Sequence, residues 1–252
     1  MSTDKKYLNQ TIGGDLRIPH NPALDIDKNN NIGYKSVDFK NIEILQFKII
    51  LIGDQSVGKT SIMSKFIYQD FKASYQATIG VDYKTKEIYL NNNTIGASLR
   101  IFDTCGEERF RSITRNYFKN SNGVFLVFDL ANKNSVKNLN IWYKDIENNV
   151  DKDCVVFVIG NKMDLKDRDY SIAQEGKQFA KEKGLNYFEV SAMTGAGVNN
   201  IFEKITKILV NNYKKGQAQN EEAKVNNNNI NFDSYNKDRG KVEQNRNQMH
   251  CC

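Results

Sequence analysis

Residues 53–60 read Gly53-Asp54-Gln55-Ser56-Val57-Gly58-Lys59-Thr60 and directly follow an apolar run at 47–52. The spacing Gly-x4-Gly-Lys-Thr lets backbone N–H groups turn inward around nucleotide phosphates, with the lysine on the β and γ oxygens and the threonine on magnesium. Helical spacing after Thr60 adds the positive end of a helix dipole. The alternative, a glycine turn without a ligand, fits these flanks poorly. We predict that the nucleotide is held here by Gly53, Gln55, Ser56, Val57, Gly58, Lys59, Thr60 and Ser61.

Composition divides the 252 residues into three parts. Residues 1–45 hold both prolines and residues 213–252 hold a run of four asparagines, and neither has sustained apolar periodicity. Because such segments cannot bury enough apolar surface to offset their ordering entropy, we expect both to be flexible. We therefore predict a disordered extension at 1–45, one domain at 46–212 and a flexible tail at 213–252. The extension is either a solvated tail, the interpretation we favour, or a partner-binding arm.

Charge and cysteine usage narrow the class of protein. The net charge of +6 comes from basic residues dispersed among acidic ones, so no nucleic-acid partner is expected. No stretch approaches the roughly 20 apolar residues of a membrane span, and the N-terminus lacks the apolar segment of a signal peptide. Cys105 and Cys154 stand singly, without metal-ligand spacing. We expect a protein made and kept in the cytosol.

Strand and helix patterns alternate through the middle of the chain. Apolar runs rich in Val, Ile and Phe predict buried strands at 47–52, 99–102, 124–130 and 155–159, with further strands at 81–90 and 187–190. Helical spacing occurs near 60–68, 134–148, 171–183 and 198–212. Ser171 with Gln174 predicts a capping box, and Gly184 predicts the end of that helix. The fold class is α/β, a doubly wound, mostly parallel sheet with ligand loops at the carboxyl ends of its strands.

A second motif, Asp103-Thr104-Cys105-Gly106, ends the strand at 99–102. A carboxylate at a strand end beside a phosphate loop suits magnesium, bound directly or through water. Asp103 alone would more often be an ordinary turn residue. Its position relative to the phosphate loop favours the metal role.

A third motif, Asn161-Lys162-Met163-Asp164, follows the strand at 155–159. The Asp164 carboxylate can accept hydrogen bonds from N1–H and the N2 amine of guanine, whereas adenine would leave it unpaired. Such a site rejects the analogue lacking those donors by about 10⁴-fold. The segment Ser191-Ala192-Met193 would complete the base pocket through a backbone N–H. Although Asn-Lys-x-Asp arises easily by chance in this chain, its order after the other two motifs indicates guanine.

From about 47 to 213 the chain resembles the Ras superfamily of small GTPases, and within it the Rab family of vesicle-traffic GTPases. The matching strings are GDQSVGKTS, ATIGVDY, DTCGEERFRSIT, NKMDL and SAM, with the terminal pair CC. ATIGVDY and ERFRSITRNYF resemble Rab signatures rather than those of Ras, Rho or Arf. Residues 55–56 and 75–78 are similar to the Golgi-associated subgroup. The resemblance implies a P-loop G domain that binds GTP or GDP with Mg²⁺ and hydrolyses GTP.

The resemblance also implies roles in switching. Thr78 would bind magnesium through its hydroxyl and the γ-phosphate through its N–H, and Gly106 would donate its N–H to the same phosphate. Phe71 would stack on guanine, and Tyr75 would close over the phosphates. Losing the γ-phosphate would release both switch segments and the partners that read them. An aromatic trio would present the GTP state to effectors: Tyr83, Phe102 and Tyr117. For Phe102, an ordinary core position is an equal alternative.

The main departure from the family pattern is Glu107. The residue after Gly106 is usually a glutamine that orients the attacking water, whereas an ionised glutamate only accepts hydrogen bonds and adds negative charge near the phosphates. With Lys59 and Gly106, Glu107 forms the candidate catalytic set. GAPs of Rabs supply an arginine and a glutamine in trans. We therefore expect GTP turnover that is slow alone and recovers with such a partner.

Cys251 and Cys252 match the double-cysteine end that Rabs have geranylgeranylated with the help of an escort protein. Two free thiols are the alternative. One lipid binds membranes marginally and two bind stably. The tail holds seven Lys or Arg against five Asp or Glu, so acidic lipids should add little. The implied location is the cytoplasmic face of intracellular membranes, at the Golgi if the subgroup similarity holds, with a cytosolic pool.

Three functions are weighed. The favoured one is a monomeric membrane-bound GTPase switch with effectors, an exchange factor, a GAP, an escort protein and a GDP-dissociation inhibitor as partners. The second, motivated by Glu107, is a membrane scaffold that binds GTP but barely hydrolyses it. The third, a P-loop kinase or ATPase, conflicts with Asn161 and Asp164. The organelle, the effectors and the exchange factor do not follow from the sequence.

Overall fold

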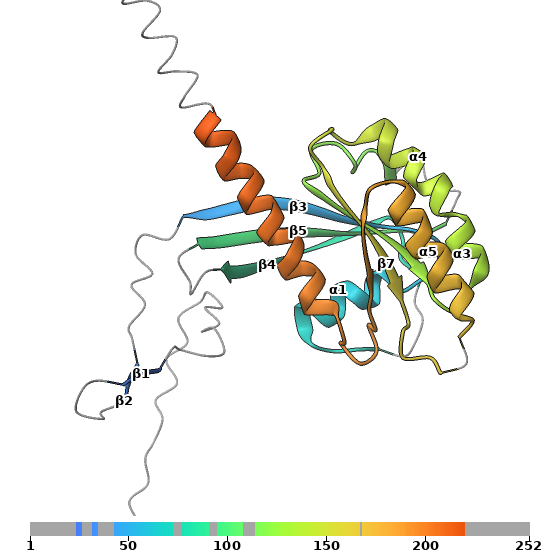
Figure 1. Cartoon of the computed structure of the whole chain (residues 1–252), viewed down its shortest axis with the longest axis horizontal. Helices are drawn as coiled ribbons and strands as arrows, with labels where there is room; N and C mark the ends of the chain where they lie inside the picture. Colours follow the sequence, from blue (N-terminus) through green and yellow to red (C-terminus); the bar gives the residue numbers. More distant parts are fainter. Residues whose placement is uncertain are drawn as a thin grey trace, which may run out of the picture.

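The computed structural model describes residues 24–26, 32–34, 43–72, 77–90, 95–107, 114–166 and 168–219. Its main sheet has six strands in the order β4-β5-β3-β6-β7-β8 (Figure 1). Neighbouring strands are parallel except β4 and β5, which are antiparallel. The strands are β3 (Ile44–Ile52), β4 (Val81–Leu90), β5 (Ile95–Thr104), β6 (Gly123–Asp129), β7 (Val155–Asn161) and β8 (Asn186–Glu189). The α/β fold class with a doubly wound, mostly parallel sheet is confirmed.

Helices follow several of the strands, as in other α/β folds. They are α1 (Lys59–Tyr68), α3 (Lys133–Lys137), α4 (Leu139–Asn149) and α5 (Tyr170–Glu182), followed by a last helix over 198–219. None of the helices in the described part of the chain has both the length and the apolar character of a membrane span. A separate antiparallel pair is formed by β1 (Leu24–Ile26) and β2 (Ile32–Tyr34).

Two apolar clusters cover the two faces of the sheet, because the central strands alternate between them. In β3, Ile49 and Leu51 point to one face, and Ile50 and Ile52 point to the other. The first face packs against α1 and the last helix, and the second against α3, α4 and α5. Burial on both faces explains the continuous apolar runs in the sequence.

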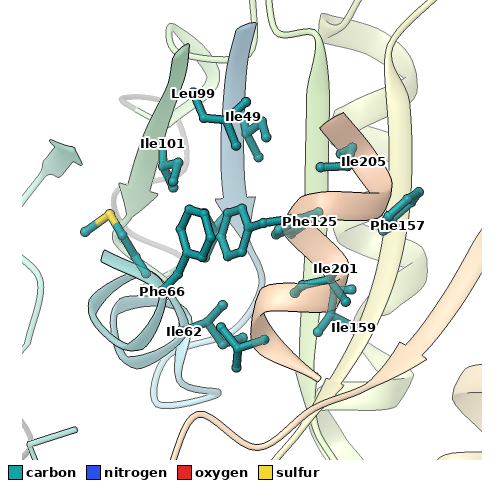
Figure 2. Packing of buried hydrophobic residues seen from close by; sticks show 14 of the residues in the cluster. Ile49, Ile62, Phe66, Leu99, Ile101, Phe125, Phe157, Ile159, Ile201 and Ile205 are labelled. Atoms are coloured by element: carbon teal, nitrogen blue, oxygen red, sulfur yellow. The ribbon is translucent and has the colours of Figure 1, made fainter. Parts of the chain in front are cut away.

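Aromatic stacking anchors the first cluster. Figure 2 shows Phe66 of α1, Phe125 of β6 and Ile201 and Ile205 of the last helix pointing into the same space. The rings of Phe66 and Phe202 stack with centroids 3.8 Å apart. Helix α1 begins at Lys59, directly after the phosphate-loop glycines, so this packing fixes where the loop ends.

Three local expectations need correction. The helix expected over 134–148 is interrupted at Asn138, whose side chain bonds Asp54 instead of facing solvent. The N-cap of α5 is Asp169, not Ser171, because the Asp169 carboxylate accepts the N–H of Ser171 at 2.8 Å. The last helix continues past 212 to 219, seven residues into the segment expected to be a flexible tail.

The end of α5 follows the prediction. Gly184 has a φ of +66°, and its N–H donates to the carbonyl of Lys181 at 3.2 Å. The N–H of Leu185 donates to the carbonyl of Ala180 at 2.8 Å. These two bonds form a Schellman motif, in which glycine takes the left-handed position without steric cost.

Candidate functional site

A cavity of about 610 Å³ opens at the carboxyl ends of β3, β5 and β7, within the size range of ligand pockets. It gathers residues of every motif found in the sequence. Those that line it as expected are Gln55, Ser56, Gly58, Lys59, Thr60, Ser61, Phe71, Thr78, Gly106, Glu107, Asn161, Lys162, Asp164, Ala192 and Met193. Tyr75 and the cysteine pair at 251–252 lie outside the described residues, so their roles stay predictions.

Gly53, Val57, Asp103 and Ser191 do not line the cavity but support its wall. A Cβ on Gly53 would lie 2.0 Å from the carbonyl oxygen of Val127, and Gly53 has a φ of +141°. A Cβ on Gly58 would lie 2.2 Å from Nδ2 of Asn161. Only glycine fits at both positions, so the loop can turn its N–H groups inward.

Lys59 spans the phosphate loop from inside. Its Nζ donates to the carbonyl oxygens of Gly53 at 2.9 Å and Asp54 at 2.7 Å. The side chain is 5% exposed, and this burial lowers its pKa to about 8 despite the opposing charge of Asp103. Burial removes water from the Lys59 ammonium and so disfavours its charged form. A phosphate in the cavity would favour that form, because it places a negative charge beside the ammonium.

The three residues predicted to hold magnesium meet at one point. The Thr60 hydroxyl donates to Oδ2 of Asp103 at 2.6 Å and lies 3.0 Å from the Thr78 hydroxyl. Asp103 is fully buried, which raises its pKa, although the Thr60 bond and Lys59 oppose the shift. Its Oδ1 has no hydrogen-bond partner among the described residues. Two hydroxyls and a buried carboxylate with an unsatisfied oxygen suit Mg²⁺, which prefers oxygen ligands.

The base end of the cavity is held by Asn161, which is 1% exposed. Its Nδ2 donates to the carbonyl of Val57 at 2.9 Å, and its Oδ1 accepts the N–H of Ala192 at 3.1 Å. Asn161 thus ties the phosphate loop to the loop after β8. The Ser191 hydroxyl donates to Oδ1 of Asp164, which orients that carboxylate.

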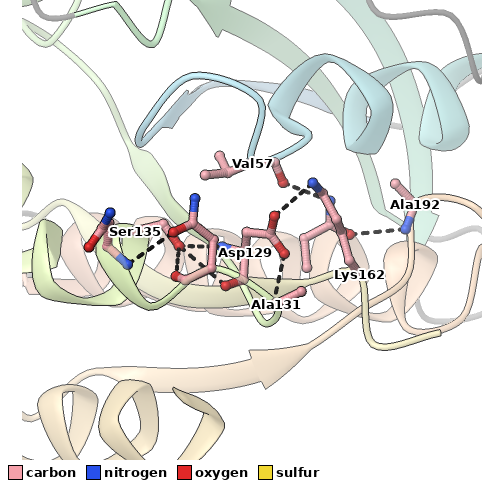
Figure 3. A network of polar contacts seen from close by, with 9 residues as sticks. Val57, Asp129, Ala131, Ser135, Lys162 and Ala192 are labelled. Carbon is pink, nitrogen blue, oxygen red and sulfur yellow. Dashed lines mark hydrogen bonds and ion pairs between the residues drawn. The ribbon is translucent and has the colours of Figure 1, made fainter. Parts of the chain in front are cut away.

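Lys162 forms a wall of the base end. It has a φ of +67°, and its Nζ pairs with Oδ2 of Asp129 at 2.7 Å (Figure 3). Asp129 also accepts the N–H of Ala131 at 2.9 Å, and its own N–H donates to the Ser135 hydroxyl. Met193 is 57% exposed at the edge of the cavity.

Gly106 lies directly against the phosphate loop. A Cβ there would come within 2.5 Å of the carbonyl carbon and oxygen of Asp54 and of the Gln55 nitrogen. Glu107 follows it and lines the cavity. The candidate catalytic set of Lys59, Gly106 and Glu107 therefore borders one space.

Sequence reasoning missed four supporting residues. Asp54 accepts hydrogen bonds from Asn138 and Trp142, and Asp129 pairs with Lys162. Asp129 had a signal, since it ends strand β6 beside the ligand loops. Asn138 and Trp142 had none, because they lie 84 and 88 residues from Asp54 in the chain.

A comparison with models of protein families matches residues 48–211 to the Ras family. The chain belongs to the Ras family. Members of this family bind GTP and GDP, generally with Mg²⁺, and hydrolyse GTP, so the chain is a small GTPase switch. The match covers every motif that lines the cavity.

The geometry assigns tasks to this small GTPase's residues. Bound Mg²⁺ would neutralise phosphate charge, and Thr60, Thr78 and Asp103 would hold it. Lys59 would hold a positive charge beside bound phosphates, and Gly58 and its neighbours would direct N–H groups toward them. Asp164 would accept the hydrogen bonds of guanine. Thr78 and Gly106 both line this cavity, so both would be placed to sense whether a γ-phosphate is present.

Proposed function

We propose that this small GTPase is of the Rab type and acts in vesicle traffic on the cytoplasmic face of intracellular membranes, with the Golgi as its first candidate. In the GTP state it recruits effectors, and hydrolysis of GTP to GDP releases them. The observation that carries the proposal is a continuous aromatic row beside the switch regions. The strings ATIGVDY and DTCGEERFRSIT and the terminal cysteine pair support it.

The row consists of Tyr83, Phe102 and Tyr117. Tyr83 on β4 pairs in register with Phe102 on β5, and their rings stack with centroids 5.5 Å apart. The Tyr117 ring lies 6.0 Å from that of Phe102, at 43°. Tyr83 is 59% exposed. Exposed, rigid rings supply large contact area at low entropic cost, which is why aromatic residues concentrate in interfaces.

Phe102 takes part in both the core and the row. It packs against the second apolar cluster while its ring lies beside those of exposed Tyr83 and half-buried Tyr117, and Lys48 Nζ lies 5.1 Å above its ring. The two interpretations of Phe102 are therefore compatible. Its seat in the core holds the two tyrosines at fixed spacing, as an effector-binding surface requires.

Prenylation of the full chain tests the Rab assignment. We expect purified Rab geranylgeranyl transferase with its escort protein to add two lipids, detected by intact mass, and to add one to each of Cys251→Ser and Cys252→Ser. The matched control is Cys154→Ser, which should still take two. Modification by a transferase that needs no escort protein, or no modification at all, would count against a Rab-type protein.

Membrane attachment follows from the same tail. Because it has only seven basic against five acidic residues, we expect stable vesicle binding to need both lipids. The doubly modified chain should sediment with neutral vesicles, while the singly modified variants should dissociate. The GDP-dissociation inhibitor should extract the GDP form and so supply the cytosolic pool.

A second candidate function is a slowly hydrolysing membrane scaffold, favoured by one observation: Glu107 lines the cavity where the family usually has glutamine. We expect slow single-turnover hydrolysis, faster hydrolysis in Glu107→Gln, and recovery of the native chain with a Rab GAP. GTP retained despite the GAP favours the scaffold. Equal rates for Glu107→Gln and the native chain would show that Glu107 does not slow the reaction.

A further inference from the structure

The side chain of Asp54 in the phosphate loop is held by the neighbouring helices. Trp142 of α4 donates its indole N–H to Oδ1 of Asp54 at 2.7 Å. Asn138, between α3 and α4, donates its Nδ2 to Oδ2 at 2.8 Å. Trp142 is 1% exposed and is the only tryptophan in the sequence. Each carboxylate oxygen therefore accepts a hydrogen bond from the region where α3 meets α4.

The backbone of Asp54 contacts two residues that line the cavity, Lys59 and Gly106. Lys59 Nζ donates to the Asp54 carbonyl oxygen at 2.7 Å. Gly106 approaches the peptide between Asp54 and Gln55 so closely that a Cβ would lie 2.5 Å away. A rotation of this peptide would move the acceptor of Lys59 and the surface against which Gly106 rests.

The position of the Asp54 carboxylate also matters for the charge near the phosphates. Gln55 and Ser56 line the cavity, whereas Asp54 does not. A carboxylate facing the phosphates would repel them. The two donors direct the Asp54 charge toward α3 and α4, and hydrogen bonds to an ionised acceptor are the stronger kind.

We propose that Trp142 and Asn138 are positioning residues of the nucleotide site. By fixing the Asp54 carboxylate they fix the peptide on which Lys59 and Gly106 rest. The α3–α4 junction is thereby coupled both to the phosphate end of the cavity and to the segment that carries Gly106. A protein that displaces this junction would loosen nucleotide without touching it.

Dissociation of a fluorescent GDP analogue from the full chain with Mg²⁺ tests the proposal. Trp142→Phe keeps most of the packing and removes one donor. We expect dissociation about 10- to 100-fold faster, the range for losing a hydrogen bond to a charged group. Asp54→Asn, which keeps the volume but turns a donor toward α3 and α4, should give a similar acceleration and covers the case in which Trp142→Phe fails to fold.

A double-mutant cycle separates positioning from general destabilisation. If Trp142 acts through Asp54, then Trp142→Phe should add no more than about twofold in the Asp54→Asn background. Phe179→Leu changes the same apolar cluster at a side chain that packs against Tyr143 and cannot hydrogen-bond Asp54. It should lower thermal stability and leave dissociation unchanged. Additive effects of the first pair, or equal acceleration by Phe179→Leu, would overturn the proposal. If the native chain fails to bind the analogue, the nucleotide assignment itself is wrong.

The emission of Trp142 provides an independent readout, because no other tryptophan contributes. We expect Asp54→Asn to shift the emission maximum or change its intensity, since the indole loses a charged acceptor. The spectrum of Phe179→Leu should match that of the native chain. Identical spectra for Asp54→Asn and the native chain would contradict the contact.

Discussion

The two ends of the nucleotide cavity are built differently. At the base end, the side-chain nitrogen and oxygen of Asn161 are each paired with backbone, and the Ser191 hydroxyl donates to the Asp164 carboxylate. At the phosphate end, Lys59 is buried with a lowered pKa, and Asp103 is buried with one oxygen lacking a partner among the described residues. The base end is complete before a ligand arrives, whereas the phosphate end carries charges that a ligand would satisfy.

This difference separates recognition from switching. A preformed base end would select guanine at little reorganisation cost, because its donors and acceptors are already oriented. The phosphate end holds groups whose buried charge costs free energy until phosphate and metal arrive. A ligand bound at that end would also meet Thr78 and Gly106, which line the same cavity. The base end contributes affinity that is the same in both nucleotide states.

The largest expected effect is a loss of the preference for guanine over adenine nucleotides. Asp164→Ala removes the carboxylate that accepts from guanine, so the preference for GDP over ADP should fall by about 10⁴-fold. Competition titrations with both nucleotides measure the ratio. The control Glu203→Ala loses only an exposed pair with Lys207 and should keep the preference. A preserved preference in Asp164→Ala would place guanine selection elsewhere.

The second prediction concerns the phosphate end. Lys59→Met removes the buried cation and should weaken both GDP and GTP by about 10³-fold, as expected for losing two charge-assisted hydrogen bonds. Its guanine preference should persist, since the base end is unchanged. Lys207→Met is the matched surface control. Loss of guanine preference in Lys59→Met would show that the two ends are not independent.

The sequence predicted most of the residues that line the cavity but not all of the residues that support them. The cavity-lining groups were predictable because phosphate, magnesium and guanine each demand particular side chains at fixed positions after a strand. The supports were not, because Trp142 and Asp54 meet across 88 residues and neither alone signals a role. Local competition explains the remaining errors: Asp169 caps α5 ahead of Ser171, and Asn138 interrupts a helix to bond Asp54.

The third prediction tests whether the base end is complete on its own. Asn161→Ala leaves the Val57 carbonyl and the Ala192 N–H without their buried partner, so unfolding of the nucleotide-free chain should cost about 2–4 kcal/mol less. Urea denaturation measures it. Asn149→Ala, which removes one bond to the carbonyl of Asp145, is the control and should cost about 1 kcal/mol or less. Equal losses would mean that Asn161 has no special structural role.

The smallest expected effect is a pH dependence of the free energy of unfolding that comes from Lys59 at the phosphate end. In the nucleotide-free chain, burial lowers the pKa of Lys59 to about 8 from 10.5. Between these values the unfolded state binds more protons than the folded state, so the free energy of unfolding should rise with pH, by about 1.4 kcal/mol per pH unit. Below pH 8 both states hold the proton and the slope vanishes. Subtracting the same profile of Lys59→Met isolates this lysine from other alkaline titrations.

Nucleotide affinity should change in the opposite direction. Because phosphates bind the charged lysine, GDP binding above pH 8 takes up a proton, and affinity should fall by up to about tenfold per pH unit. Lys59→Met should lack this dependence as well. A native chain whose stability and affinity are both flat from pH 8 to 10 would mean that Lys59 is not held as a desolvated cation. The phosphate end would then be as self-sufficient as the base end, and the contrast between them would fail.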